Sequence, residues 1–111
     1  MFKNEVAEFI YKRTYSRWLE DENRREDWPE TIERFISFVI SERPDIPEKT
    51  QVKIRKYMTE FAVMPSMRFL WAAGPAAKAD NTCIYNCSFA KINSVEAFAE
   101  CLYVLMCGTG F

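Results

Sequence analysis

The chain has 111 residues, of which 49% are hydrophobic and 28% are charged, and its net charge is −1. This length suits one compact domain, and the composition excludes disordered and collagen-like chains. The near-zero charge argues against nucleic acid as a partner, and no apolar run reaches the roughly 18 residues that a membrane span needs. Because the N-terminus also lacks the apolar core of a signal peptide, we expect a cytoplasmic protein without a membrane partner.

Apolar residues at helical spacing predict three helices within residues 1–64. They are expected over 2–18, from Trp28 to Arg43, and from Pro47 onward. Pro29 suits the first turn of the second helix, which Arg43-Pro44 ends. The charged residues 19–27 favour a solvated loop between the first two helices. Residues 1–64 are therefore predicted to form a helical N-terminal region.

Residues 65–111 have a different pattern. A short helical or irregular piece, MRFLWAAG, is closed by Gly74, and the small residues over 75–81 predict a loop. The loosely alternating apolar residues that follow predict a strand near 82–92.

A last helix is predicted near 95–107, with Ser94 as its cap and Gly108 as its end. It is apolar almost all round, which is typical of a helix buried on every face. Because 111 residues can hardly surround such a helix, and a glycine-rich segment over 108–111 follows it, we expect the sequence to be the first part of something larger.

The residues that could bind metal or act as nucleophiles are few. The chain has no histidine, and its four cysteines are Cys83, Cys87, Cys101 and Cys107. The absence of histidine excludes serine–histidine and cysteine–histidine catalysis and any histidine metal ligand within this chain. The cysteine spacing differs from the paired C-x2-C of zinc ribbons, and nothing indicates a secreted disulfide framework. We therefore predict no metal site, and a zinc-stapled binding domain stays open as an alternative.

Several motifs occur in one order along the chain. They are Thr14-Tyr15-Ser16-Arg17-Trp18, Arg24-Arg25-Glu26-Asp27-Trp28 with Glu30-Thr31, Pro65-Ser66-Met67-Arg68-Phe69-Leu70-Trp71 with Ala73-Gly74, Asp80-Asn81, Asn86-Cys87-Ser88-Phe89, and Leu105-Met106-Cys107-Gly108-Thr109-Gly110-Phe111. With these motifs the chain resembles the N-terminal region of adenosylcobalamin-dependent (class II) ribonucleotide reductases, of the monomeric ribonucleoside-triphosphate reductase type.

The resemblance implies a fold of two parts. Residues 1–64 would be the mainly α N-terminal part, and 65–111 would begin a ten-stranded α/β barrel with its first strand, first helix and the start of a glycine loop over 108–111. The domain would be incomplete until a second chain completes it, so the sequence is expected to be the N-terminal subunit of a split reductase.

The resemblance also implies site residues. Cys87 falls on the catalytic cysteine of the first strand, which forms a redox-active disulfide with a cysteine from a later strand while the ribose loses its 2′-hydroxyl. Asn86 falls beside the ribose, and Ser66 falls where the family places a small hydroxyl residue near the nucleotide. Thr109 and Gly110 fall on the glycine loop near the base.

The implied activity is reduction of ribonucleotides to deoxyribonucleotides by thiyl-radical chemistry, for DNA replication. Adenosylcobalamin would be bound mainly by a large C-terminal reductase chain, and a thioredoxin-type protein would be the reductant. This chain alone is expected to be inactive. The alternative is a non-catalytic helical interaction module or a relic fragment, which would fold and stay monomeric by itself.

Overall fold

The computed structural model describes residues 2–111, and Met1, the first residue of the predicted helical region, lies outside them. The described part is mainly helical, with one pair of very short antiparallel strands. In chain order the elements are α1 (Glu5–Thr14), β1 (Trp18–Leu19), β2 (Arg24–Arg25), α2 (Trp28–Glu42), α3 (Glu48–Thr59), α4 (Met67–Ala72), α5 (Pro75–Ala79), the 3-10 turn η1 (Asn81–Ile84) and α6 (Val95–Met106). Between residues 2 and 111 we find no helix with the length and apolar character of a membrane span.

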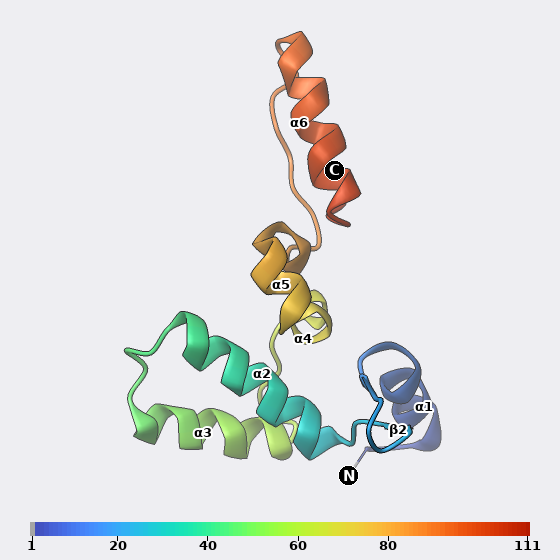
Figure 1. The fold of residues 1–111 in the computed structure, drawn as a ribbon, viewed down its shortest axis with the longest axis vertical. Coiled ribbons are helices and arrows are strands. Elements are labelled where there is room, and N and C mark those ends of the chain that lie inside the picture. Colours follow the sequence, from blue (N-terminus) through green and yellow to red (C-terminus); the bar gives the residue numbers. More distant parts are fainter. Residues whose placement is uncertain (1) are drawn as a thin grey trace.

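The elements form an elongated molecule with α6 at one end (Figure 1). α2 and α3 pack together as a helical hairpin, and α1 with the strand pair lies beyond the start of α2. α4 and α5 lie in the middle, where both contact η1. A long extended segment leads from η1 to α6, so α6 stands apart from the other helices.

The predicted starts of α2, α3 and α6 are confirmed, whereas the first helix begins at Glu5 instead of Phe2, with Asn4 as its cap. Asp27 and Glu30 form a reciprocal capping box at the start of α2, and Arg43 follows its last residue. Pro47 directly precedes α3, and the Ser94 hydroxyl accepts a hydrogen bond from the first turn of α6. These local signals suffice because each places a side-chain acceptor or a proline where a helix has unpaired N–H groups.

Two predictions for the N-terminal region are wrong in extent. α1 ends at Thr14 instead of reaching residue 18, because the next residues bind Glu26 instead of continuing the helix. The Ser16 hydroxyl donates to the Glu26 carbonyl (2.7 Å), and the Arg17 amide donates to the Glu26 carboxylate (3.1 Å). The same pairing draws the predicted loop over 19–27 into the strands β1 and β2.

Two predictions for the C-terminal region are also wrong. The expected strand near 82–92 is absent from the described chain: η1 takes its start, and the remainder makes a single parallel bridge, between Cys87 and Gly110. A strand needs a neighbour along its length, and residues 2–111 offer this segment only residue 110. The expected loop over 75–81 begins with the helix α5, because Pro75 fits the first helical turn and the alanines after it favour helix.

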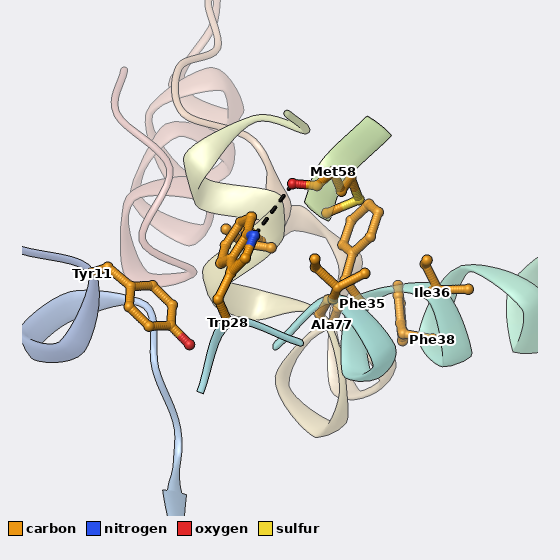
Figure 2. Close-up of a cluster of buried hydrophobic side chains, with 10 residues drawn as sticks. Tyr11, Trp28, Phe35, Ile36, Phe38, Met58 and Ala77 are labelled. Carbon is orange, nitrogen blue, oxygen red and sulfur yellow. Dashed lines mark hydrogen bonds between the residues drawn. The ribbon is translucent and has the colours of Figure 1, made fainter. Parts of the chain in front are cut away.

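The apolar stripe of α2 is the centre of the core. The Trp28 ring stacks on Phe61 with 5.0 Å between ring centroids, and it meets the Tyr11 ring edge-on at 5.5 Å. Its Nε1 donates to the Met58 carbonyl at 3.3 Å (Figure 2). The buried cluster comprises Tyr11, Trp28, Ile32, Phe35, Ile36, Phe38, Met58, Leu70, Ala73 and Ala77. All five helices from α1 through α5 therefore contribute to this core, and α6 contributes no residue to it.

The predicted burial of α6 on every face is not found within residues 2–111. Ala97 is the one buried residue of α6, whereas Val95 is 82% exposed and Met106 is 78% exposed. We name the exposed large residues of this helix other than Tyr103 the α6 apolar surface; they are Val95, Phe98, Leu102, Leu105 and Met106. The helix forms because its own backbone bonds and its cap suffice locally, while the core around α2 leaves it uncovered.

Glu26 is the centre of a buried polar network, with only 4% of the residue exposed. Its carboxylate accepts hydrogen bonds from Arg34 Nε (2.8 Å) and from the Thr31 hydroxyl (2.9 Å). Its backbone carbonyl accepts from the Ser16 hydroxyl and from Lys12 Nζ (2.8 Å). One glutamate thus joins the end of α1, the strand pair and α2.

Arg34 extends this network to α4. Its Nη1 donates to the carbonyls of Leu70 (3.1 Å) and Ala73 (2.8 Å), and its Nη2 donates to the Tyr15 carbonyl (3.3 Å). The Leu70 and Ala73 carbonyls lie at the end of α4, where a helix leaves carbonyls without partners, and the Tyr15 carbonyl lies at the end of α1. The position of α4 relative to α2 therefore depends on the Glu26–Arg34 pair.

We predict that Arg34→Met lowers the free energy of unfolding by roughly 3 kcal/mol, because it leaves the Glu26 carboxylate buried without a counter-charge. Urea unfolding followed by tryptophan fluorescence measures this change. The matched control is Arg43→Met, which removes an ion pair with Asp45 in which both side chains are more than 60% exposed (67% and 63%), and which should leave the transition unchanged. An Arg34→Met chain with wild-type stability would contradict the role given to Glu26.

Candidate functional site

Asn86 and Cys87 lie against the glycine-rich segment that follows α6. The Gly110 amide donates to the Asn86 carbonyl (2.9 Å), and the Ser88 amide donates to the Gly110 carbonyl (2.8 Å). A Cβ at Gly110 would lie 3.3 Å from the Asn86 carbonyl oxygen and 3.8 Å from Cys87 Sγ. Glycine at this position therefore allows the backbone to come up to the cysteine.

Thr109 holds this segment in place from the inside. It is 1% exposed, and its hydroxyl donates to the Thr82 carbonyl (2.7 Å), with the Tyr85 carbonyl as a second acceptor at 3.2 Å. The resemblance implied that Thr109 contacts substrate. In the structure its hydroxyl is used within the protein, and its amide donates to the Val104 carbonyl (3.2 Å), so Thr109 holds the loop from within.

Ser66 lies at the start of α4, where its hydroxyl accepts a hydrogen bond from the Phe69 amide (3.1 Å). It does not line a cavity with the other predicted residues. Met67 and Arg68, which follow Ser66, line a cavity of about 290 Å³ together with Asn86. Its lining residues are Thr14, Tyr15, Met67, Arg68, Trp71 and Asn86. The structure thus gathers Asn86, Cys87, Thr109 and Gly110. Ser66 stays outside this group, at the start of α4.

A larger cavity, of about 550 Å³, lies between α1 and the end of α3. Aromatic and aliphatic side chains such as Phe2, Trp28 and Phe61 line most of it. None of the predicted site residues is among its lining, so its size alone does not make it part of this site.

Asp80 anchors α6, which the sequence analysis did not foresee. One oxygen of its carboxylate accepts from the Thr82 amide (2.8 Å), and the other accepts from the Tyr103 hydroxyl and from Cys107 Sγ (3.5 Å). The spacing from residue 80 to residues 103 and 107 carries no sequence signal, because these partners meet only when α6 turns back onto η1. Together with Thr109, Asp80 fixes where the chain after α6 meets Cys87.

These contacts shift proton affinities. The bond to the Asp80 carboxylate raises the pKa of Tyr103 to about 12, and the same bond holds the pKa of Asp80 well below its ordinary range. Desolvation, with the negative charge of Asp80 beside it, raises the pKa of the Cys107 thiol. Cys107 is therefore kept as a neutral thiol that donates to Asp80, which suits a structural residue.

Among the four free thiols, Cys87 is the exposed one, whereas Cys83, Cys101 and Cys107 are partly buried. A thiol that solvent and other molecules can reach is able to take part in thiol–disulfide exchange. Residues 2–111 contain no cluster of three or more cysteine or acidic side chains that could hold a metal ion. The four-cysteine zinc alternative therefore finds no support in this arrangement.

Docking of α6 is predicted to depend on pH at both extremes. The pKa of Tyr103 is raised to about 12 from an ordinary value near 10, so its contribution is complete below pH 10 and is lost as the pH rises through 12. The pKa of Asp80 is lowered, so its contribution is present above about pH 4 and is lost as the pH falls through the lowered value.

Ultraviolet titration of the tyrosines tests the alkaline limit. Tyr103→Phe should remove an ionisation step near pH 12, whereas the control Tyr57→Phe, on α3, should leave that step in place. Loss of a step near pH 10 instead of near pH 12 in Tyr103→Phe would refute the bond between Tyr103 and Asp80.

Comparison with known proteins identifies a family model and several relatives of this chain. The family model of the ribonucleotide reductase alpha domain matches residues 1–75. Among curated proteins, an adenosylcobalamin-dependent ribonucleoside-triphosphate reductase of Lactobacillus gasseri is 34% identical over 100 residues, and its namesake in Lactobacillus acidophilus is 31% identical over 104 residues. These matches cover 79% and 83% of this chain.

A protein of Mycobacterium phage D29, provisionally given the same name, is 40% identical over 72 residues, or 62% of this chain. No solved structure matches the chain. The chain spans only 10% to 14% of the length of these three relatives. Because the family model covers well over half of its residues, the chain belongs to the ribonucleotide reductase family.

Proposed function

We propose that this chain supplies the catalytic Cys87 and the start of the glycine loop to a ribonucleotide reductase that converts ribonucleoside triphosphates to 2′-deoxyribonucleotides. The observation that carries the proposal is the pairing of Cys87 with Gly110, which sets an exposed thiol beside a backbone segment with no side chain. The names of the relatives support a ribonucleoside triphosphate as the substrate.

In this proposal Cys87 is one of two thiols that are oxidised together. The ribose loses its 2′-hydroxyl as water and gains a hydrogen at that carbon, while Cys87 and a cysteine of the partner chain give up two protons and two electrons and become a disulfide. A thioredoxin-type dithiol then reduces this disulfide by exchange. Free thiols and such a reductant suit the cytoplasm, where we place the protein.

Asn86 and Gly110 are the proposed substrate contacts of this chain. The Asn86 side chain is exposed and borders the 290 Å³ cavity, so it can reach a ribose held beside Cys87. Gly110 leaves room for a base to approach the backbone. Ser66, at the start of α4, is a further proposed contact, and Thr109 holds Gly110 in place through its hydroxyl bonds to the Thr82 and Tyr85 carbonyls.

Adenosylcobalamin is the proposed cofactor, because the relatives are named as dependent on it. When bound, it supplies the radical that starts the reaction. The residues described here do not fit it: the 550 Å³ cavity suits a drug-sized ligand rather than a much larger corrinoid, and its lining contains none of the site residues. We therefore assign its binding to the partner chain.

That partner is a large C-terminal reductase chain, and the α6 apolar surface is its proposed docking face. The matched region is at most 14% of these relatives, so most of the barrel that surrounds α6 would come from the partner. An apolar surface of this kind is typical of an obligate interface that resembles a core cut in two. This chain alone would then be inactive.

We predict that Cys87→Ser in the assembled enzyme lowers turnover with thioredoxin by a factor on the order of a thousand or more, because serine cannot form the disulfide. Deoxyribonucleotide formation with adenosylcobalamin and thioredoxin measures this. The control Cys101→Ser changes a partly buried thiol on α6 and should keep turnover. Normal turnover by Cys87→Ser would remove the catalytic role of Cys87.

We predict that Leu102→Glu lowers the affinity for the C-terminal reductase chain by about a hundredfold or more, because it buries an unpaired charge in the interface. Sedimentation of the purified pair measures this affinity. The control is Val52→Glu on α3, a residue of similar exposure (56% against 59%), which should leave assembly intact. A wild-type chain that stays monomeric beside the reductase chain would favour the alternative of an independent helical module.

A further inference from the structure

Arg68 connects the helical core to the glycine loop. It is the second residue of α4, the helix whose end is fixed by the Arg34 bonds to the Leu70 and Ala73 carbonyls. Leu70 and Ala73 are each 1% exposed, so this helix is firmly seated in the core. Because α4 is fixed in the core, the Arg68 side chain, which extends from α4 toward residues 108–110, can hold these residues at a fixed distance from the core.

The Arg68 guanidinium is held by an indole ring rather than by an acid. Its Cζ lies 5.5 Å from the ring centroid of Trp71, one turn further along α4. Arg17 lies 5.3 Å from the same ring, and its Nη2 donates to the Trp71 carbonyl. None of the salt bridges between residues 2 and 111 includes Arg68. The geometry of Trp71 thus determines where Arg68 points.

Arg68 points at the turn that begins the glycine loop. A Cβ built on Gly108 would lie 3.2 Å from Arg68 Nη1, so the guanidinium packs directly on the Gly108 backbone. Gly108 also has a φ of +89°, which other residues adopt at a cost. The conformation at Gly108 favours glycine here, and a side chain at this position would displace the Arg68 guanidinium.

Three consecutive residues of the loop each contact a different part of the protein. Gly108 meets Arg68, Thr109 bonds to carbonyls of the turn over 82–85, and Gly110 meets Asn86 and Cys87. The supports of Thr109 and Gly110 come from the same short stretch, 82–87. Arg68 is the support that comes from the helical core, and it borders the cavity that Asn86 also lines.

We propose that Arg68 is a positioning residue that fixes the glycine loop at Gly108 and thereby sets how the enzyme discriminates between bases. This inference rests on the proposed function, in which residues 109 and 110 lie near the base. Without the guanidinium, Gly108 loses its packing partner, and the backbone of the loop can move relative to Cys87. A purine and a pyrimidine fill the space beside that backbone differently, so such a movement affects them unequally.

The test measures kcat and KM of the assembled reductase for ATP, GTP, CTP and UTP without added effectors. We expect Arg68→Met to change the purine-to-pyrimidine ratio of kcat/KM by about tenfold, with KM changing more than kcat. The matched control is Arg17→Met, which removes the other guanidinium from Trp71 without touching Gly108 and should leave the ratio as in wild type.

Arg68→Lys keeps the charge and the aliphatic stem and provides a folded variant if Arg68→Met does not assemble. We expect it to shift the same ratio in the same direction. A folded Arg68→Lys or Arg68→Met enzyme with wild-type ratios, or one that loses activity equally on all four substrates, overturns the proposal. If Cys87→Ser is inactive in parallel, only the role of Arg68 fails; if Cys87→Ser keeps turnover, the proposed function itself fails.

Discussion

The buried pair of Glu26 and Arg34 is the interaction on which the other parts of the structure depend. Burying two charges is expensive, and it is tolerated only when each receives further hydrogen bonds. Here the glutamate collects donors from α1, from the residues between α1 and β1, and from α2, while the arginine satisfies carbonyls at the end of α4. The apolar cluster around Trp28 supplies the burial, and the ion pair determines how the elements are oriented within it.

α6 and the chain after it are held mainly by polar contacts. Asp80 and Thr109 attach α6 and the chain after it to η1, and the described apolar core does not extend to α6. This part therefore has a defined geometry and little buried apolar area, which is expected of a surface that a partner covers. The exposed Cys87 lies in this part of the molecule, where it pairs with Gly110.

Family membership and the candidate site rest on different parts of the chain. The matched alpha domain ends at residue 75 and includes Ser66, whereas Asn86, Cys87, Thr109 and Gly110 follow it. Arg68 and Trp71 lie within the matched part of the sequence. Arg68 packs on Gly108, and the Trp71 ring packs on the Arg68 guanidinium. The matched part of the chain thus takes part in the site, because the Arg68 side chain packs on Gly108 of the glycine loop.

The sequence by itself determined where α2, α3 and α6 begin, since proline, serine and aspartate caps and apolar stripes act within a few residues, and the motif Asn86-Cys87 suggested the candidate site. Only the tertiary structure decided the end of α1, the loss of the strand near 82–92, the inward turn of the Thr109 hydroxyl and the Asp80–Tyr103 bond. Each of these depends on partners distant in sequence: Glu26 competes with helix continuation, and a strand without a neighbour cannot satisfy its backbone.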